Sequence, residues 1–210
     1  MAVILERPTS DAVRNAEERF DKENRAIEDA LGGLFTQFPE NKKTDHVLLK
    51  VTVLNQLYFT RIPLYSKRVP IVFEVVDHIV GLNIDSALNL SAPDLVYKIA
   101  RTEVANKKVH FNYSFATKYC SWHNPDCYPI YDSRVDECLY HLMNQGYVKH
   151  FDRQDLKIYL RLKEIVSELR GGCGLAEFTF KQMDKFLYYE GAKLLREHEN
   201  DGEKAKTIDE

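Results

Sequence analysis

The side chains best suited to chemistry lie between residues 114 and 135. Lys118 stands on a predicted short helix, a turn marked by Pro125 and Pro129 follows, and Asp132 comes directly before another predicted helix. An aspartate in this position can cap the helix by accepting hydrogen bonds from backbone N–H groups, which is worth about 1 kcal/mol. Held rigidly, the same carboxylate can stabilise a developing cation or activate a water molecule. The sequence leaves both uses open.

Residues 128–135, which read Tyr-Pro-Ile-Tyr-Asp-Ser-Arg-Val, resemble the segment around the catalytic aspartate of helix-hairpin-helix DNA glycosylases. Residues 51–61 resemble an early helix of that superfamily, and residues 180–191 resemble a closing helix of some divergent relatives. The resemblance implies an all-α fold with two helical lobes and a cleft between them. It also implies a DNA glycosylase-like hydrolase that releases a damaged or modified base, with Asp132 as the catalytic carboxylate.

The same resemblance implies roles for other residues. Lys118 becomes the charged neighbour of Asp132, although it precedes the aspartate by only 14 residues, closer than the nucleophilic lysine of bifunctional members. We therefore expect simple hydrolysis of the N-glycosidic bond rather than strand cleavage. Asn55 and Gln56 are expected to face the flipped nucleotide or its opposite strand. Three aromatic residues are candidates for stacking on the extruded base, although core packing is the commoner role of such side chains: Tyr58, Trp122 and Tyr131.

Members of the superfamily hold a DNA phosphate with a glycine-rich hairpin, whereas the corresponding stretch here, residues 104–114, contains no glycine. Four residues of this stretch are candidates for phosphate binding in its place: Lys107, Lys108, Asn112 and Ser114. The missing glycines and the acidic chain favour a second hypothesis, a non-enzymatic helical module that binds nucleic acid or a protein partner. A hydrolase that acts on RNA or a nucleotide is a third.

Charge is distributed unevenly along the 210 residues. The whole chain has a net charge of −3, whereas residues 42–118 hold 11 basic and 6 acidic residues, a net of +5. Such a stretch can face phosphates without making the whole protein adhere to nucleic acid, and it can also be an ordinary solvated surface. Duplex DNA with a flipped base is the partner we expect, and the oligomeric state stays open.

The sequence predicts no metal and no cofactor. The alternative is a zinc site, because four potential ligands lie within 19 residues but lack the paired spacing of zinc sites: Cys120, His123, Cys127 and Cys138. No apolar run approaches the roughly 20 residues needed to cross a bilayer, and the scattered cysteines are typical of reduced thiols. We therefore expect a cytoplasmic protein that does not contact a membrane.

Periodicity and capping residues predict a chain made mostly of helices. We expect one helical domain at 1–196, with a long N-terminal helix at 10–38, core lobes at 47–196, and a charged, flexible tail at 197–210. The predicted helices cover residues 10–38, 47–62, 69–80, 93–105, 115–122, 133–145, 152–169 and 178–198.

Overall fold

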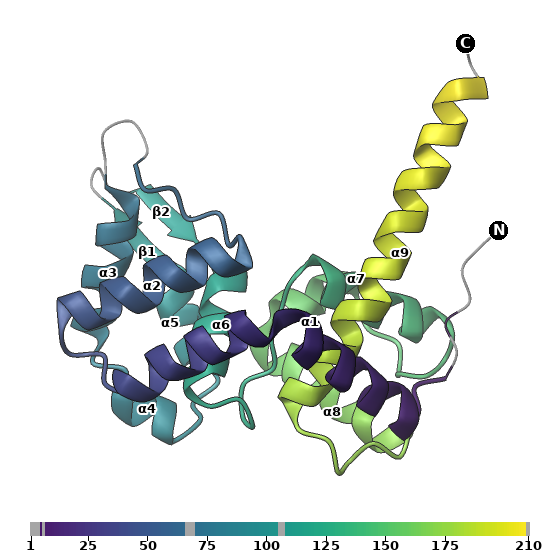
Figure 1. Ribbon diagram of the computed structural model, residues 1–210, viewed down its shortest axis with the longest axis horizontal. Coiled ribbons are helices and arrows are strands. Elements are labelled where there is room, and N and C mark those ends of the chain that lie inside the picture. Colours follow the sequence, from purple (N-terminus) through teal and green to yellow (C-terminus); the bar gives the residue numbers. More distant parts are fainter. Residues whose placement is uncertain (1–4, 6, 66–69, 105–107, 209–210) are drawn as a thin grey trace. The chain divides into compact units, whose positions relative to one another are not determined.

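The computed structural model describes residues 5, 7–65, 70–104 and 108–208, and most of these are helical, as predicted (Figure 1). The helices are α1 (Ser10–Gln37), α2 (Thr44–Tyr58), α3 (Ile71–Leu82), α4 (Asp85–Asn89), α5 (Leu95–Ala100), α6 (Tyr113–His123), α7 (Ser133–Asn144), the 3-10 helix η1 (Arg153–Lys157), α8 (Tyr159–Gly172) and α9 (Phe180–Ile208). Two strands, β1 (Arg101–Val104) and β2 (Lys108–Phe111), form an antiparallel pair.

The chain divides into two compact units. The central unit comprises residues 21–130, and the terminal unit combines the residues up to Phe20 with those from Tyr131 onward. Helix α1 contributes to both, because its first residues belong to the terminal unit and the rest to the central unit. Its buried residues, among them Val13, Phe20 and Leu31, recur at roughly helical spacing, as an amphipathic helix requires.

Helices α2, α3, α5 and α6 form the core of the central unit. Helix α2 packs against α3 and α6, and α5 packs against α6. Their contact faces carry fully buried apolar side chains such as Leu54, Val76, Ile99 and Phe115. This burial removes apolar surface from water, which is the main source of folding free energy.

The terminal unit is organised around α7 and α9, which lie side by side (Figure 1). Gly191 of α9 is buried against the first turn of α7, and a Cβ atom at this position would come within 2.0 Å of the Arg134 carbonyl oxygen. Only glycine permits this approach, so Gly191 sets how closely α9 can approach the start of α7.

The hairpin of β1 and β2 corrects one prediction. The sequence predicts a helix over residues 93–105, but the helix ends at Ala100 and a strand follows, in which Arg101 pairs with Phe111 and Thr102 with His110. The physical reason is that successive side chains of a strand point to opposite faces. Thr102 is buried on one face, while its sequence neighbours Arg101 and Glu103 are exposed on the other. Residues 101–104 and 108–111 are therefore paired strands and not helix.

Two further helices end four or more residues away from their predicted C-termini. Helix α2 ends at Tyr58 instead of residue 62, because Phe59 adopts a left-handed conformation with φ 48°. Helix α9 continues beyond residue 198 to Ile208 and so includes most of the segment for which the sequence predicts a flexible tail.

Candidate functional site

Asp132 is the N-cap residue of α7 in the terminal unit. Its backbone is extended, with φ −151° and ψ −178°, and its Oδ1 accepts hydrogen bonds from the backbone N–H groups of Arg134 (3.0 Å) and Val135 (3.1 Å). These bonds satisfy two donors that a helix start leaves without intrahelical partners. They also fix the carboxylate relative to a rigid helix, so the capping use predicted from the sequence is present and the carboxylate is held in place.

A cavity of about 360 Å³ lies within the terminal unit next to this cap. The residues on either side of Asp132 both line it, and the lining as a whole consists of Tyr131, Ser133, Asp136, Glu137, Arg153, Gln154, Lys157 and Leu195. Most of these side chains are polar, which suits a ligand that offers several hydrogen-bonding groups.

The buried carboxylate of Asp136 organises this cavity. Its Oδ2 accepts a hydrogen bond from the Tyr131 hydroxyl at 2.8 Å, and its Oδ1 accepts one from Arg153 Nε at 2.5 Å. Arg153 also donates to Glu137 through Nη2 at 2.6 Å. Burial, followed by the hydrogen bond to Asp136, raises the pKa of Tyr131, so its hydroxyl stays protonated at neutral pH. Tyr131 is thus oriented by Asp136, and its predicted stacking on a base stays a prediction.

Lys118, by contrast, belongs to the central unit and is buried. Its side chain donates a hydrogen bond from Nζ to Ser114 Oγ at 2.9 Å, and Nζ lies 5.6 Å from the centroid of the Tyr58 ring. Trp122 lies beside the same tyrosine, with 6.5 Å between the ring centroids. One cluster in the central unit therefore holds Lys118, Ser114, Tyr58 and Trp122. Within it, Lys118 contacts Ser114, a predicted phosphate ligand, and Tyr58, a predicted stacking residue.

Asn55 holds the chain that follows α2. Its Oδ1 accepts hydrogen bonds from Thr60 Oγ1 (2.7 Å) and from the backbone N–H of Ile62 (2.9 Å), while its Nδ2 donates to the Ile62 carbonyl at 2.8 Å. This clamp holds Phe59 and Arg61, both with positive φ, in conformations that non-glycine residues adopt only when their surroundings impose them. Gln56, the other residue predicted to face the nucleotide, is exposed.

Three of the four predicted phosphate ligands lie on or after β2. Lys108 is an exposed residue of β2, and Lys107 falls outside the described residues. Asn112 precedes α6, its backbone N–H bonds to the Ala100 carbonyl at 2.9 Å, and its side chain makes no cap hydrogen bond. Ser114 follows in the first turn of α6, with its hydroxyl bound to Lys118. Lys108 is therefore part of the hairpin itself, and Asn112 and Ser114 follow it at the start of α6.

Sequence analysis missed a buried lysine, Lys50. Its Nζ donates hydrogen bonds to the carbonyls of Phe38 (3.0 Å) and Glu40 (3.1 Å) and to Asn41 Oδ1 (2.7 Å), and it lies 3.4 Å from His123 Nε2. A single lysine inside the apolar stretch 47–54 is the signal that could have revealed it. Because three oxygen atoms surround the ammonium group, Lys50 ties the chain between α1 and α2 to the core.

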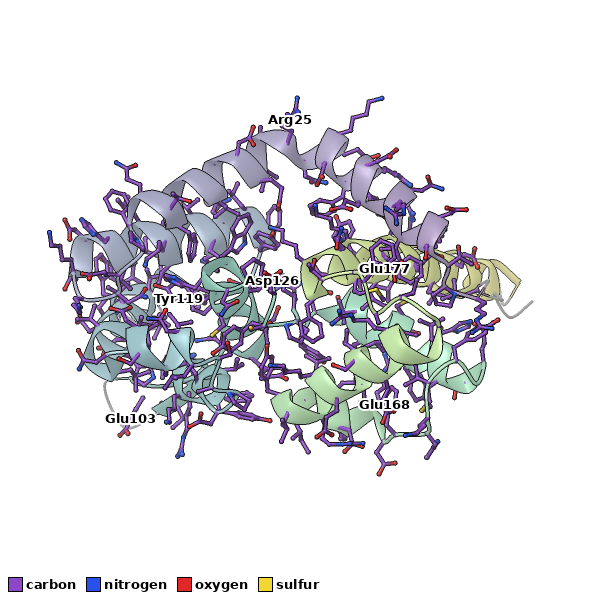
Figure 2. The ribbon with its side chains drawn as sticks, turned by 90° about the horizontal axis from the view of Figure 1, so that it is seen from below. Arg25, Glu103, Tyr119, Asp126, Glu168 and Glu177 are labelled. Atoms are coloured by element: carbon purple, nitrogen blue, oxygen red, sulfur yellow. The ribbon has the colours of Figure 1, made fainter. Side chains whose placement is uncertain are left out.

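This lysine belongs to a wider buried network. The Tyr119 hydroxyl donates to the same Asn41 oxygen at 2.5 Å, and Asn41 Nδ2 donates to Asp85 Oδ1 at 2.8 Å. Figure 2 shows Tyr119 among the helices of the central unit. Burial lowers the pKa of Lys50 to about 8, against the opposing effect of the Asp85 charge. Burial, and then the charge of Lys50, lowers the pKa of His123 to about 3, so His123 is neutral.

The part of the chain that the structure describes contains no group of three or more His, Cys, Asp or Glu side chains arranged to hold a metal ion. Of the four potential zinc ligands, Cys120 and Cys138 are fully buried, and burial raises the pKa of both thiols. A cysteine binds zinc as the thiolate, and this burial disfavours the thiolate. Within the same described ranges, no helix has the length and apolar character to span a membrane.

Comparison with known proteins gives a family for the chain. Residues 10–127 match the family described as HI_0787_N, an N-terminal domain. An uncharacterized protein of Haemophilus influenzae is 33% identical over 137 residues, which cover 65% of this chain and 65% of that protein. No solved structure matches the chain. The family match covers all of α1 and nearly all of the central unit, and it ends before Asp132.

Proposed function

This chain belongs to the HI_0787_N family, and we propose from its own residues that it is a DNA glycosylase-like hydrolase that releases a damaged or modified base. The observation that carries the proposal is the position of Asp132. Its carboxylate begins a helix, three residues after Pro129, and two backbone N–H groups orient it. The resemblance of residues 128–135 to the catalytic segment of the glycosylases requires this arrangement. The expected two-lobed, DNA glycosylase-like fold with its cleft and the cytoplasmic location belong to the same proposal.

Asp132 would act on the bond between the sugar and the base. As the C1′–N bond breaks, its electron pair leaves with the base and positive charge develops on the sugar, where a fixed carboxylate stabilises it. A water molecule then forms the new C1′–O bond and gives a proton to Asp132, while the released base takes a proton from solvent. The base must first leave the duplex stack, which costs a few kcal/mol. No nucleophilic lysine is needed, so the DNA strand stays intact.

The test is a base-release assay on duplex DNA that carries a panel of damaged and modified bases, with mass spectrometry of the small molecules. Asp132→Asn is the informative variant, because asparagine caps a helix about as well as aspartate. We expect it to unfold like the wild type and to release no base. Asp152→Asn is the matched control, since Asp152 also caps a helix, η1. It should release base at the wild-type rate. Release by Asp132→Asn at the wild-type rate would refute the proposal.

A second candidate is the non-enzymatic module that binds nucleic acid. The β-hairpin favours it, because β2 lies in the stretch 104–114, where the resemblance implies a glycine-rich hairpin that holds a phosphate and where this chain has no glycine. Such a protein would bind duplex DNA with an affinity that falls steeply with salt, and it would release no base from any substrate. The same assay therefore separates the two functions.

A further inference from the structure

Arg134 carries the first positive charge of α7, in the same turn as Asp132. Its backbone N–H donates to Asp132 Oδ1 at 3.0 Å, so the side chain of Arg134 starts beside this carboxylate. Arg134 is half-buried, and its guanidinium carbon lies 4.1 Å from the centroid of the Tyr188 ring. A long basic side chain is therefore ordered within one helical turn of the carboxylate that we propose acts on the sugar.

The packing of α9 against α7 places Tyr188 next to this guanidinium. Gly191, where a Cβ atom would clash with the Arg134 carbonyl oxygen, allows the two helices to approach closely. Tyr188 precedes Gly191 by three residues, so both lie on the same side of α9. The Phe20 ring contacts Tyr188 edge-on, with 5.5 Å between the ring centroids and 87° between the planes. Tyr188 is thus fixed by packing, and it orders the guanidinium in turn.

The N–H donors of Arg134 are available to a ligand. Within the residues that the structure describes, its guanidinium forms no hydrogen bond and no ion pair, whereas Arg161 of the same unit binds Glu164 at 2.5 Å. When a guanidinium stacks on an aromatic ring, its N–H bonds lie parallel to the ring and point outward. Such a fork matches the oxygen atoms of a phosphate or a carboxylate group. Arg134 is therefore an ordered set of donors suited to an anion.

We propose that Arg134 binds a backbone phosphate of the nucleotide whose glycosidic bond Asp132 breaks. The inference rests on the proposed function, because that function puts the sugar of this nucleotide at Asp132. A sugar is joined to each of its phosphates through a single oxygen atom, so a phosphate then lies close to the same turn of α7. An unrelated carboxylate ligand has no such link to Asp132.

The contact serves two purposes. It positions the sugar against the carboxylate, since phosphate contacts fix the register of a protein on DNA. The positive charge of Arg134 also offsets the repulsion between the Asp132 carboxylate and the negatively charged DNA backbone. A carboxylate that must work beside phosphates needs such a cation in its own turn of helix.

The test is fluorescence anisotropy of the full chain with a fluorescein-labelled duplex that contains one tetrahydrofuran abasic-site analogue, which keeps the sugar and phosphates but has no base to release. We expect Arg134→Gln to weaken binding about 10-fold, as for the loss of a charge-assisted hydrogen bond. It should also reduce the slope of log affinity against log salt by about 0.9, the value for one phosphate contact on duplex DNA. Arg134→Lys should keep the wild-type slope, because it keeps the charge, and bind more weakly, because it loses the fork.

Arg161→Gln is the matched control, because it removes the same charge from an arginine of the same unit that already binds Glu164. It should bind with the affinity and the salt slope of the wild type. In the base-release assay, Arg134→Gln should raise KM about 10-fold and change kcat much less, since the phosphate contact exists both before and during bond breaking. Asp132→Asn, by contrast, should lose kcat.

Three results would overturn the proposal. The wild type does not bind the duplex, or Arg134→Gln binds like Arg161→Gln, or Arg134→Gln loses affinity but keeps the salt slope of the wild type. The third result would mean that Arg134 acts only through the packing of α7 against α9, and urea unfolding of the variant would then show a loss of stability.

This proposal and the hydrolase fail in distinguishable ways. If the wild type releases no base while Arg134→Gln lowers both affinity and salt slope, the hydrolase is refuted and a phosphate contact by Arg134 stands. If base release depends on Asp132 while Arg134→Gln binds and reacts like the wild type, the hydrolase stands and the phosphate contact is refuted.

Discussion

The buried ammonium group of Lys50 makes the stability of the protein depend on pH. In the folded state the pKa of Lys50 is lowered from 10.5 to about 8, chiefly by burial. Between these two values the unfolded chain binds more protons than the folded chain, so stability rises with pH. The cost of the buried charge is fully present below pH 8 and is relieved as the pH approaches 10.5.

The magnitude follows from the shift. A difference of about 2.5 between the two pKa values corresponds to about 3 kcal/mol at 1.36 kcal/mol per unit. About 2 kcal/mol of this is gained between pH 7 and pH 9.5, a range that avoids most tyrosine titration. Lys50→Met removes the titrating group and keeps much of the side-chain volume. The free energy of unfolding of the wild type minus that of Lys50→Met should therefore increase by about 2 kcal/mol across this range.

Urea unfolding followed by fluorescence is a suitable assay, because Trp122 is the only tryptophan and lies in the central unit, 5.9 Å from the Phe35 ring. The variant also leaves three oxygen acceptors without their donor, which shifts its stability by a constant amount but adds no slope. Lys149→Met, at an exposed surface position, is the control and should show no pH-dependent difference. A difference that stays flat or falls from pH 7 to pH 9.5 would refute the reasoning about burial.

Two further substitutions test the geometry around the candidate sites. Gly191→Ala places a Cβ atom 2.0 Å from the Arg134 carbonyl oxygen and should destabilise the protein by about 1–3 kcal/mol in thermal unfolding. Gly171→Ala is the control, because a Cβ atom there meets no atom within 4 Å, and it should not destabilise the protein. Equal melting temperatures of the two variants would contradict the close approach at Gly191. Asn55→Ala removes the hydrogen bonds that hold the chain after α2 and should cost about 1–3 kcal/mol in urea unfolding, whereas exposed Gln56→Ala should change stability by less than about 0.5 kcal/mol. Unchanged stability of Asn55→Ala would show that the clamp does not stabilise the loop.

The sequence predicts the long helices well, because apolar residues recur at helical spacing over many turns. Helix α1 begins at Ser10, as predicted, and ends at Gln37, one residue before the predicted end. The hairpin escaped prediction because each strand has only four residues, too few for a period of two to stand out beside a preceding helix. Ala100 and Arg101 are compatible both with a continuing helix and with the end of one. The strand is distinguished from a helix by the burial of Thr102, which only the folded structure shows.

The candidate sites were predictable to a different degree. The placement of Asp132 at a helix start follows from the proline-containing turn before it and the periodic residues after it. Lys50 was not predictable as a hydrogen-bonding centre, because its partners come from the chain around Phe38 and Asn41 and from His123, far along the sequence. Similarly, the contact between Lys118 and Tyr58 joins two helices whose packing no local pattern specifies.

The capping and catalytic interpretations of Asp132 do not exclude each other. A catalytic carboxylate must keep one orientation while charge develops on the sugar, and two backbone N–H bonds to Oδ1 supply that orientation from a rigid helix. The cap alone would be equally well served by asparagine, whereas stabilising a cation requires the negative charge. Asp132→Asn therefore removes one function and preserves the other, and a loss of base release at unchanged stability would mean that the charge itself is needed.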